Sequence, residues 1–549
     1  MKITSIIGGG VLSAVLAACS SNLFFPIPSA NSDNIRAHVE YLASDALAGR
    51  QTGSAGYREA ADYVADQFRR LGLESITGDD YFQQVPFRRA TWGEHTATFQ
   101  LHGREGDIRF DAGQDFFAAP PITDEDTAVS AGLVFVGYGI EAPEYGVDDY
   151  AGLDLQGKIA VVLDGRPRQL PTEVGAHYAS GRTKRETAAR HGAVGYIVLN
   201  TPAREARRPF ARSAAHINDP QFDWLRADGV PGNAIRGFHP GVVLDMPAAK
   251  QLFIGAPRSL DTVFTEMENH LVPKGFPLPY SATLSSGAEH EQIASANVVG
   301  LLPGADPRLR DEYVVFSAHL DHIGMDRPAG GDGGNHDLIN NGAQDNAAGI
   351  AVMLEVARLF VESGRAPRRS ILFVAVTGEE EGLLGSDYFA QHPPVPPKSL
   401  VANINLDMPM LLYPFRDVIA FGAEHSSLGE TAAHAAARAG LKLSPDPMPE
   451  QVIFVRSDHY SFVRRGVPSI YLISGREAID SNIDGTEAQV NFLKTRYHSP
   501  GDEADSQVNY VAAQQFAEVN YVIAREVTDG DRAPRWNRGD FFGDLYRQQ

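Results

Sequence analysis

The residues of this chain that could do chemistry gather in five short polar segments: 317–322, 341–349, 377–386, 405–408 and 497–502. Imidazole and carboxylate groups recur in them, and thiolates do not, because the single cysteine is Cys19. Imidazole with carboxylate is a donor set suited to Zn²⁺ at a hydrolytic centre. A pair of ions needs about two outer ligands each, a bridging carboxylate and a water. The protein side of such a set is supplied by His319, Asp345, Glu380, Asp407 and His498.

Each of these residues has an ordinary structural interpretation when it is taken alone. A histidine at a strand end, such as His319, is commonly a packed side chain, and adjacent glutamates commonly form a solvated loop. Asp345 could cap the helix that follows it, and Asp407 could be a carboxylate in a turn. Their joint occurrence, in order and at the ends of apolar strands, favours a metal site over these separate explanations.

The elements around these segments alternate between strand and helix. Residues 313–316 and 371–376 are continuous apolar runs of the buried-strand type, and 347–361 carries apolar residues at helical spacing. Such alternation predicts an α/β fold with a mostly parallel sheet flanked by helices on both faces. Ligand sites in these sheets lie at the carboxyl ends of strands, where the polar segments fall.

The rest of the chain gives a second pattern. Amphipathic helices are expected around 35–42 and 61–71, on either side of the polar, glycine-bearing segment 48–54. Residues 133–199 then contain short β-branched runs at 133–136, 158–163 and 194–199. They include one helix-like stretch, 183–191, and residues 200–285 are expected to be irregular.

Taken together, the five segments resemble the co-catalytic di-zinc peptidases that include bacterial leucyl aminopeptidase, aminopeptidase Y and glutamate carboxypeptidase. The resemblance covers about 33–110 and 285–530 and implies a zinc-exopeptidase-like fold with two Zn²⁺ per chain. It implies that His319 and Asp407 hold different ions, that Asp345 bridges them, and that Glu380 and His498 complete the two ligand sets.

The resemblance also implies roles for three further residues. Glu379 would be the general base, Asp321 would orient a ligand imidazole through its carboxylate, and Tyr497 would donate to the developing oxyanion. Packing beside a metal ligand is an equally good explanation for Tyr497. His322 is interpreted as a neighbour of the site and not as a ligand.

Residues 135–140, 148–159 and 184–199 resemble the protease-associated (PA) domain that is inserted in such enzymes. The predicted organisation is a first catalytic part at 34–125, a β-rich PA insertion at 126–275 and a second catalytic part with the metal site at 276–535. Whether the insertion selects substrate or only packs against the catalytic domain stays open.

The N-terminus has the features of a targeting signal. An apolar stretch ends in Leu16-Ala17-Ala18-Cys19, which resembles a bacterial lipoprotein signal, and an ordinary secretory signal is the alternative. The expectation is a signal peptide at 1–18, lipidation of Cys19, a tether at 19–33, and attachment to the outer membrane facing the periplasm. The net charge of −21 argues against nucleic acid as a partner. The sequence does not indicate the oligomeric state.

The expected function is a zinc-dependent aminopeptidase that hydrolyses N-terminal residues from peptides with metal-activated water. A carboxypeptidase or a glutaminyl cyclase of the same fold is the alternative. A carboxypeptidase would need cationic capture of a terminal carboxylate, for which Arg456 and Arg464 are candidates. A catalytically inactive binding protein is a third possibility, but such a protein would be expected to have lost at least one of the site residues.

Overall fold

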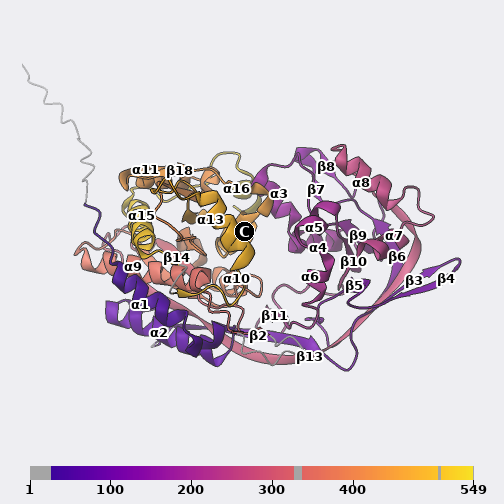
Figure 1. The fold of residues 1–549 in the computed structure, drawn as a ribbon, viewed down its shortest axis with the longest axis horizontal. Helices are drawn as coiled ribbons and strands as arrows, with labels where there is room; N and C mark the ends of the chain where they lie inside the picture. Colours follow the sequence, from indigo (N-terminus) through magenta and orange to yellow (C-terminus); the bar gives the residue numbers. More distant parts are fainter. Residues whose placement is uncertain (1–25, 79, 327–336, 505–507, 548–549) are drawn as a thin grey trace, which may run out of the picture.

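The computed structural model describes residues 26–78, 80–326, 337–504 and 508–547, so Cys19 and the predicted signal peptide lie outside the described residues. Two β-sheets share one long strand, β13 (Phe276–Leu302), which runs from one into the other (Figure 1). Its second half pairs with β15 (Ser370–Val376), and its first half pairs with β6 (Asp126–Phe135). The first sheet and its helices are called the catalytic unit below, and the second sheet with its helices the inserted unit.

The catalytic unit is built on parallel strands. In its sheet, β15, β14 (Tyr313–His319), β16 (Leu400–Leu406) and β19 (Ser469–Ser474) pair in parallel in that order. Antiparallel pairing extends the sheet at β13 and at β19. The strands that extend it are β1 (Glu74–Ser75), β2 (Phe82–Trp92), β11 (Gln221–Trp224), β17 (Asp417–Phe421) and β18 (Lys442–Ser444).

Helices cover both faces of this sheet because successive strand residues point to opposite sides. Val314 and Phe316 of β14 pack in one core, and Val315 between them packs in the other. Helices of the first face are α1 (Ser32–Leu42), α2 (Ala55–Leu71), α9 (Ala348–Glu362), α11 (Leu428–Arg438) and α15 (Tyr510–Asp529). Helices α10 (Leu384–Gln391) and α12 (His459–Val463) contribute to the second core. Two further helices are α13 (Gly485–Thr495) and α16 (Phe541–Tyr546).

The inserted unit has a mixed sheet and short helices. Strand β13 lies between β3 and β6, and the sheet continues through β9, β10, β12 and β5. The strands are β3 (Thr98–Gly103), β4 (Gly106–Phe110), β5 (Phe116–Phe117), β9 (Ile159–Leu163), β10 (Gly195–Leu199) and β12 (His239–Leu244), with a separate hairpin of β7 (Glu141–Ala142) and β8 (Val147–Asp148). The helices are α3 (Thr172–Ala179), α4 (Gly181–Arg190), α5 (Pro202–Arg207), α6 (Phe210–Ala214), α7 (Met246–Gln251) and α8 (Leu260–Glu268).

Two expectations about this region differ from the structure. Residues 200–285 are not irregular, because they contain four short helices, two strands and the start of β13. The sheet of the inserted unit also takes in β3 and β4, which precede the predicted boundary at 126. These elements are short and half exposed, so they lack the continuous apolar runs by which buried strands are recognised in a sequence.

A buried ionic contact joins the two units. His425 lies between Glu173 of α3, which contacts its Nε2, and Asp540, whose Oδ2 is 2.5 Å from its Nδ1. Although burial opposes the charge, the carboxylates of Asp540 and Glu173 raise the pKa of His425 to about 10. The imidazole is therefore doubly protonated at neutral pH, with a carboxylate on each nitrogen, which fixes α3 against the catalytic unit.

Among the described residues, no helix combines the length and the apolar composition that crossing a membrane would require.

Candidate active site

Three of the predicted ligands meet where β14 and β16 end. His319 is the last residue of β14, and its Nε2 lies 3.0 Å from Oδ1 of Asp407, which follows β16. The same nitrogen lies 3.2 Å from Oδ1 of Asp345, which precedes α9. All three side chains are nearly inaccessible to solvent. Since the two strands are parallel neighbours, their carboxyl ends bring these residues to one edge of the sheet.

A second group forms on the other oxygen of Asp345. Oδ2 of Asp345 lies 3.2 Å from Nε2 of His498, and the same nitrogen lies 3.2 Å from Oε2 of Glu380. Nδ1 of His322 is 2.7 Å from Oε1 of Glu380. Asp345 thus directs one carboxylate oxygen into each group, which is the arrangement required of a bridging ligand.

Both groups fit zinc. In each of them, one ligand atom per residue lies within 4.8 Å of the others. Buried carboxylates this close together need cations to balance them, and imidazole with carboxylate is a usual donor set for Zn²⁺. His319, Asp345 and Asp407 would hold one ion, and Asp345, Glu380 and His498 the other. The expectation that His319 and Asp407 hold different ions is therefore wrong, because the parallel neighbours β14 and β16 end side by side and bring these two side chains into one group. His322, predicted as a neighbour, also has a ring nitrogen within the second group.

The predicted role of Asp321 needs correction. Nδ1 of His319 contacts the main-chain carbonyl of Asp321 at 3.0 Å, so the imidazole is oriented by the backbone and not by the carboxylate. The carboxylate instead accepts hydrogen bonds from the amides of Glu379 at 3.2 Å and Glu380 at 3.3 Å. These two hydrogen bonds bring the Asp321 side chain to the loop that follows β15. It therefore positions the two glutamates.

Glu379 and Glu380 take different positions, as consecutive residues must. The carboxylate of Glu380 belongs to the second group of ligands, whereas neither group among the described residues includes that of Glu379. Burial raises the pKa of Glu379 well above its usual range, and the charges of Asp407 and Glu380 act in the same direction against that of His319. A carboxylate in this setting has the proton affinity that a general base needs.

Tyr497 packs directly against a ligand. Its ring lies over the imidazole of His498, with 3.9 Å between the ring centroids. Burial raises the pKa of its hydroxyl well above the usual range, with Asp345 and Glu380 adding to the effect. The phenol therefore stays protonated and can serve as a donor beside the site. This position is compatible with both interpretations of Tyr497, oxyanion donor and packing residue.

Sequence reasoning missed the buried Arg50, which holds two ligand segments together. Its guanidinium donates to the carbonyl of Leu320 at 3.0 Å, just after His319. It also donates to the carbonyls of Asn341 at 2.7 Å and Gly342 at 3.1 Å, just before Asp345. The glycine-bearing segment 48–54 signals an unusual loop, but nothing in the sequence gives its partners.

Asp502 and Asn346 have comparable supporting positions. The fully buried carboxylate of Asp502 accepts hydrogen bonds from the amides of Gln344 at 3.0 Å and Asp345 at 3.1 Å. The side-chain amide of Asn346 donates to the carbonyl of Leu406 at 2.9 Å and accepts from the amide of Met408 at 3.1 Å, on either side of Asp407. Both residues lie inside the polar segments 341–349 and 497–502. Their closeness in the sequence to Asp345 and His498 could have identified them as supporting residues.

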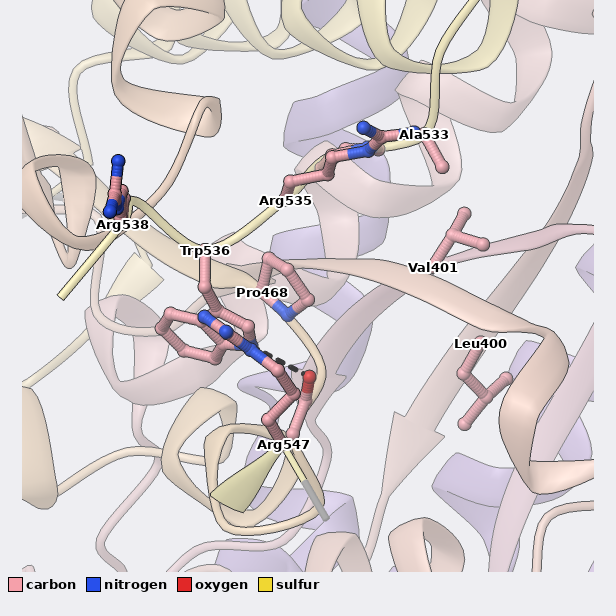
Figure 2. A pocket seen from close by; sticks show the side chains of 10 residues that line it. Leu400, Val401, Pro468, Ala533, Arg535, Trp536, Arg538 and Arg547 are labelled. Atoms are coloured by element: carbon pink, nitrogen blue, oxygen red, sulfur yellow. Dashed lines mark hydrogen bonds between the residues drawn. The ribbon is translucent and has the colours of Figure 1, made fainter. Parts of the chain in front are cut away.

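A separate pocket of about 490 Å³ lies away from these groups (Figure 2). The C-terminal segment forms one wall, where the indole of Trp536 donates to the carbonyl of Gly466 at 2.7 Å. Its lining consists of Leu400, Val401, Gly466, Pro468, Ala533, Pro534, Arg535, Trp536, Arg538 and Arg547. None of the predicted site residues is among them, so this pocket is distinct from the candidate active site.

The segment that carries the candidate active site is similar in sequence to a known protein family. Residues 297–524 match peptidase family M28. The M28 match contains all five predicted ligands and Glu379, and it begins after the inserted unit. It confirms, for this segment, the peptidase resemblance predicted from the five polar motifs. The match does not extend to the predicted PA domain or to the N-terminal signal.

Individual relatives agree with the M28 match. The chain is 40% identical over 100 residues to a "Probable zinc metalloprotease" of Pyricularia oryzae, which is 18% of each chain. It is 25% identical over 268 residues to a "probable leucine aminopeptidase 2" of Aspergillus oryzae, 47% of this chain and 50% of that one. The chain thus spans less than two thirds of the length of these relatives.

A solved structure resembles nearly the whole chain. "Aminopeptidase from Aneurinibacillus sp. strain AM-1" has a TM-score of 0.52 and 20% sequence identity, and the likeness covers 93% of this chain and 95% of that one. At this identity the comparison concerns the fold. It confirms the predicted α/β class, with its mostly parallel central sheet flanked by helices.

Proposed function

We propose that this chain is a zinc-dependent exopeptidase with two Zn²⁺ ions, and that it acts as an aminopeptidase on the N-terminal residues of peptides. The observation that carries the proposal is the division of the Asp345 carboxylate, with Oδ1 toward His319 and Oδ2 toward His498. A carboxylate shared by two histidine-containing groups is what a pair of ions requires. The match of residues 297–524 to family M28 and the names of the relatives support the same activity.

The side chains around the ligands supply the rest of the reaction. When bound, the two ions would polarise the scissile carbonyl and lower the pKa of the attacking water. Glu379 takes the proton from that water and returns it to the leaving amine. Asp321 fixes the main chain of Glu379 and Glu380 through their amides. The hydroxyl of Tyr497, which stays protonated, donates to the oxygen that gains negative charge.

Blocked dipeptides test this function. Purified zinc-loaded protein should hydrolyse Leu-Ala amide, whose N-terminus is free, and leave N-acetyl-Leu-Ala untouched, with the products identified by mass spectrometry. The reverse pattern would show a carboxypeptidase, for which Arg464 is a poor anchor because it pairs with Glu186 at 3.2 Å. Formation of pyroglutamyl peptides from N-terminal glutamine would show the cyclase. If none of these peptides were converted, the chain would be a catalytically inactive binding protein.

We also propose that the chain is a lipoprotein of the bacterial cell envelope, anchored through Cys19 to the outer membrane and facing the periplasm. The support is the sequence Leu16-Ala17-Ala18-Cys19 after an apolar stretch. Cells fed labelled palmitate should label the wild-type protein but not the Cys19→Ser variant. Equal labelling of both proteins, or label in neither, would contradict the proposal.

A further inference from the structure

His322 lies beside the second group of ligands, and the proposed reaction gives it no role. Its side chain is inaccessible to solvent, and its Nδ1 lies 2.7 Å from Oε1 of Glu380. Its ring also meets that of His498 edge to face, with 5.5 Å between the ring centroids. A buried imidazole beside two zinc ligands is either a further ligand or a residue that holds a ligand in place. The distances between the side chains separate these two roles.

Ligands that share one zinc ion have a characteristic spacing. Nitrogen and oxygen donors lie about 2.0–2.1 Å from zinc in a tetrahedral site, so any two of them are about 3.3 Å apart. Nε2 of His498 lies 3.2 Å from Oδ2 of Asp345 and 3.2 Å from Oε2 of Glu380. In the first group, Nε2 of His319 lies 3.0 Å from Oδ1 of Asp407 and 3.2 Å from Oδ1 of Asp345. All four separations are close to the spacing that a shared ion imposes.

The contact of His322 with Glu380 is of a different kind. At 2.7 Å it has the length of a charge-assisted hydrogen bond, about 2.7–2.9 Å, and it is shorter than the spacing of two ligands on one ion. It also involves the other carboxylate oxygen, because Oε2 of Glu380 is the one that faces His498. Nε2 of His322 is buried and has no hydrogen-bond partner in the part of the chain that the structure describes. The proton of the neutral imidazole therefore belongs on Nδ1, where a carboxylate oxygen accepts it.

The main chain around His322 keeps the ring in that position. The amide of His322 donates to the carbonyl of Arg50 at 3.2 Å. Gly342 lies against the ring, since a Cβ atom at residue 342 would come within 2.6 Å of Cδ2 of the imidazole. The guanidinium of Arg50 in turn donates to the carbonyl of Gly342 at 3.1 Å. The packed ring is thus held against the Glu380 carboxylate by the same segments that support the ligands.

We infer that His322 is a positioning residue for Glu380, securing the second zinc ion without binding it, and this rests on the two-zinc site proposed above. His322 donates from Nδ1 to Oε1 of Glu380, which leaves Oε2 for the ion. Asp321 accepts a hydrogen bond from the main-chain amide of Glu380 at 3.3 Å. The ligand is therefore fixed at both ends, at its main chain by Asp321 and at its carboxylate by His322.

The second ion is the one that should depend on this support. His498, the imidazole ligand of the second group, is 32% exposed, whereas His319 of the first group is 1% exposed. Water reaches the more exposed group more easily and competes there for the ion. Without His322, the Glu380 carboxylate is free to rotate about its last bond and no longer keeps one oxygen toward the ion. The loss of His322 should therefore weaken one of the two ions and spare the other.

Zinc affinity, measured for each ion in the full-length protein, tests this role. The wild-type protein and His322→Leu, which has no donor at this position, are titrated with a zinc chelator of known affinity. Elemental analysis then gives the zinc that stays bound at each chelator concentration. In His322→Leu the weaker of the two ions should bind about 10–100-fold less tightly, as expected when a residue supporting a ligand is removed. The tighter ion should keep its wild-type affinity.

His322→Asn separates positioning from ligation. The amide nitrogen of asparagine can take the place of Nδ1, so this variant keeps a donor for Oε1 of Glu380 but has no imidazole. It should bind both ions nearly as tightly as the wild-type protein does. With Co²⁺ bound in place of Zn²⁺, its visible spectrum should match that of the wild-type protein, because the ligands are the same.

His38→Leu is the matched control. His38 of α1 also makes a 2.7 Å contact through Nδ1, with the hydroxyl of Tyr63, but it belongs to neither ligand group. Its replacement removes an imidazole and a hydrogen bond of the same length. The affinities for both zinc ions should stay at the wild-type values.

The outcomes separate this inference from the proposed function. If the wild-type protein binds two zinc ions and releases leucine, but His322→Leu binds both ions equally well, His322 has no positioning role and the proposed function stands. If His322→Asn loses the weaker ion as His322→Leu does, or its Co²⁺ spectrum changes, the imidazole is itself a ligand and the positioning role is excluded. If circular dichroism shows that His322→Leu does not fold, His322→Asn decides by itself. A wild-type protein that binds fewer than two zinc ions, or releases no leucine, would contradict the proposed function.

Discussion

Replacing Glu379 with Gln is expected to lower kcat by about 10²–10⁴-fold, the range that a general acid–base contributes, while the zinc content stays at the wild-type level. The carboxylate of Glu379 lies outside both ligand groups, so its loss should leave both ions bound. The amide keeps the shape and the hydrogen bonds of the main chain but cannot accept the proton of the attacking water. Steady-state kinetics and elemental analysis of the same preparation measure both quantities.

Glu381→Gln is the matched control for that variant. Glu381 lies two residues beyond Glu379 in the same loop, and burial raises the pKa of its carboxyl to about 8. Because the side chain is already largely neutral at pH 7, its amide analogue should change kcat by no more than about twofold. If Glu379→Gln instead lost zinc and kept part of its activity, the roles of Glu379 and Glu380 would have to be exchanged.

Asp345→Asn is expected to cost more activity than any other single ligand change, because Asp345 alone contributes to both groups. The loss in kcat/KM should exceed the roughly 10–100-fold that removal of a residue supporting a ligand costs. Asp407→Asn is the comparison, since Asp407 belongs to one group and the second ion would keep its ligands. Equal residual activity in the two variants would show that Asp345 is an ordinary ligand of one ion.

The ligand set was predictable from the sequence because strand ends are visible there. The apolar runs at 313–316 and 371–376 lie within β14 and β15, and the residues that follow them, His319 and Glu380, reach the site as expected. Parallel strands put their carboxyl ends at one edge, so residues far apart in the chain could be assigned to one site. Their division between the two ions could not, since His319 and Asp407 were expected on different ions and lie in one group.

The supporting contacts were not predictable, since they depend on partners distant in the chain. Arg50 lies about 270 residues from the Leu320 carbonyl that it binds, and no local pattern indicates that pairing. Asp321 shows the same limit, because its type and spacing suggested a contact with the His319 ring, yet its carboxylate turns to the amides of the next loop. A residue type fixes what a side chain can bind, but the fold decides which group it meets.

The extent of the inserted unit was also beyond sequence reasoning. Strand β13 belongs to both sheets, so no linker or change in composition marks the point where one unit becomes the other. The arginine-rich helices α5 and α6 are short, and short helices carry little periodicity.

We propose above that one carboxylate, Asp345, joins two zinc ions in the active site. Elemental analysis of the purified wild-type protein, dialysed against metal-free buffer and assayed for leucine release before and after, tests it most directly. We expect about two zinc ions per active chain, with activity rising in step with zinc occupancy. Fewer than one zinc ion per fully active chain would contradict it.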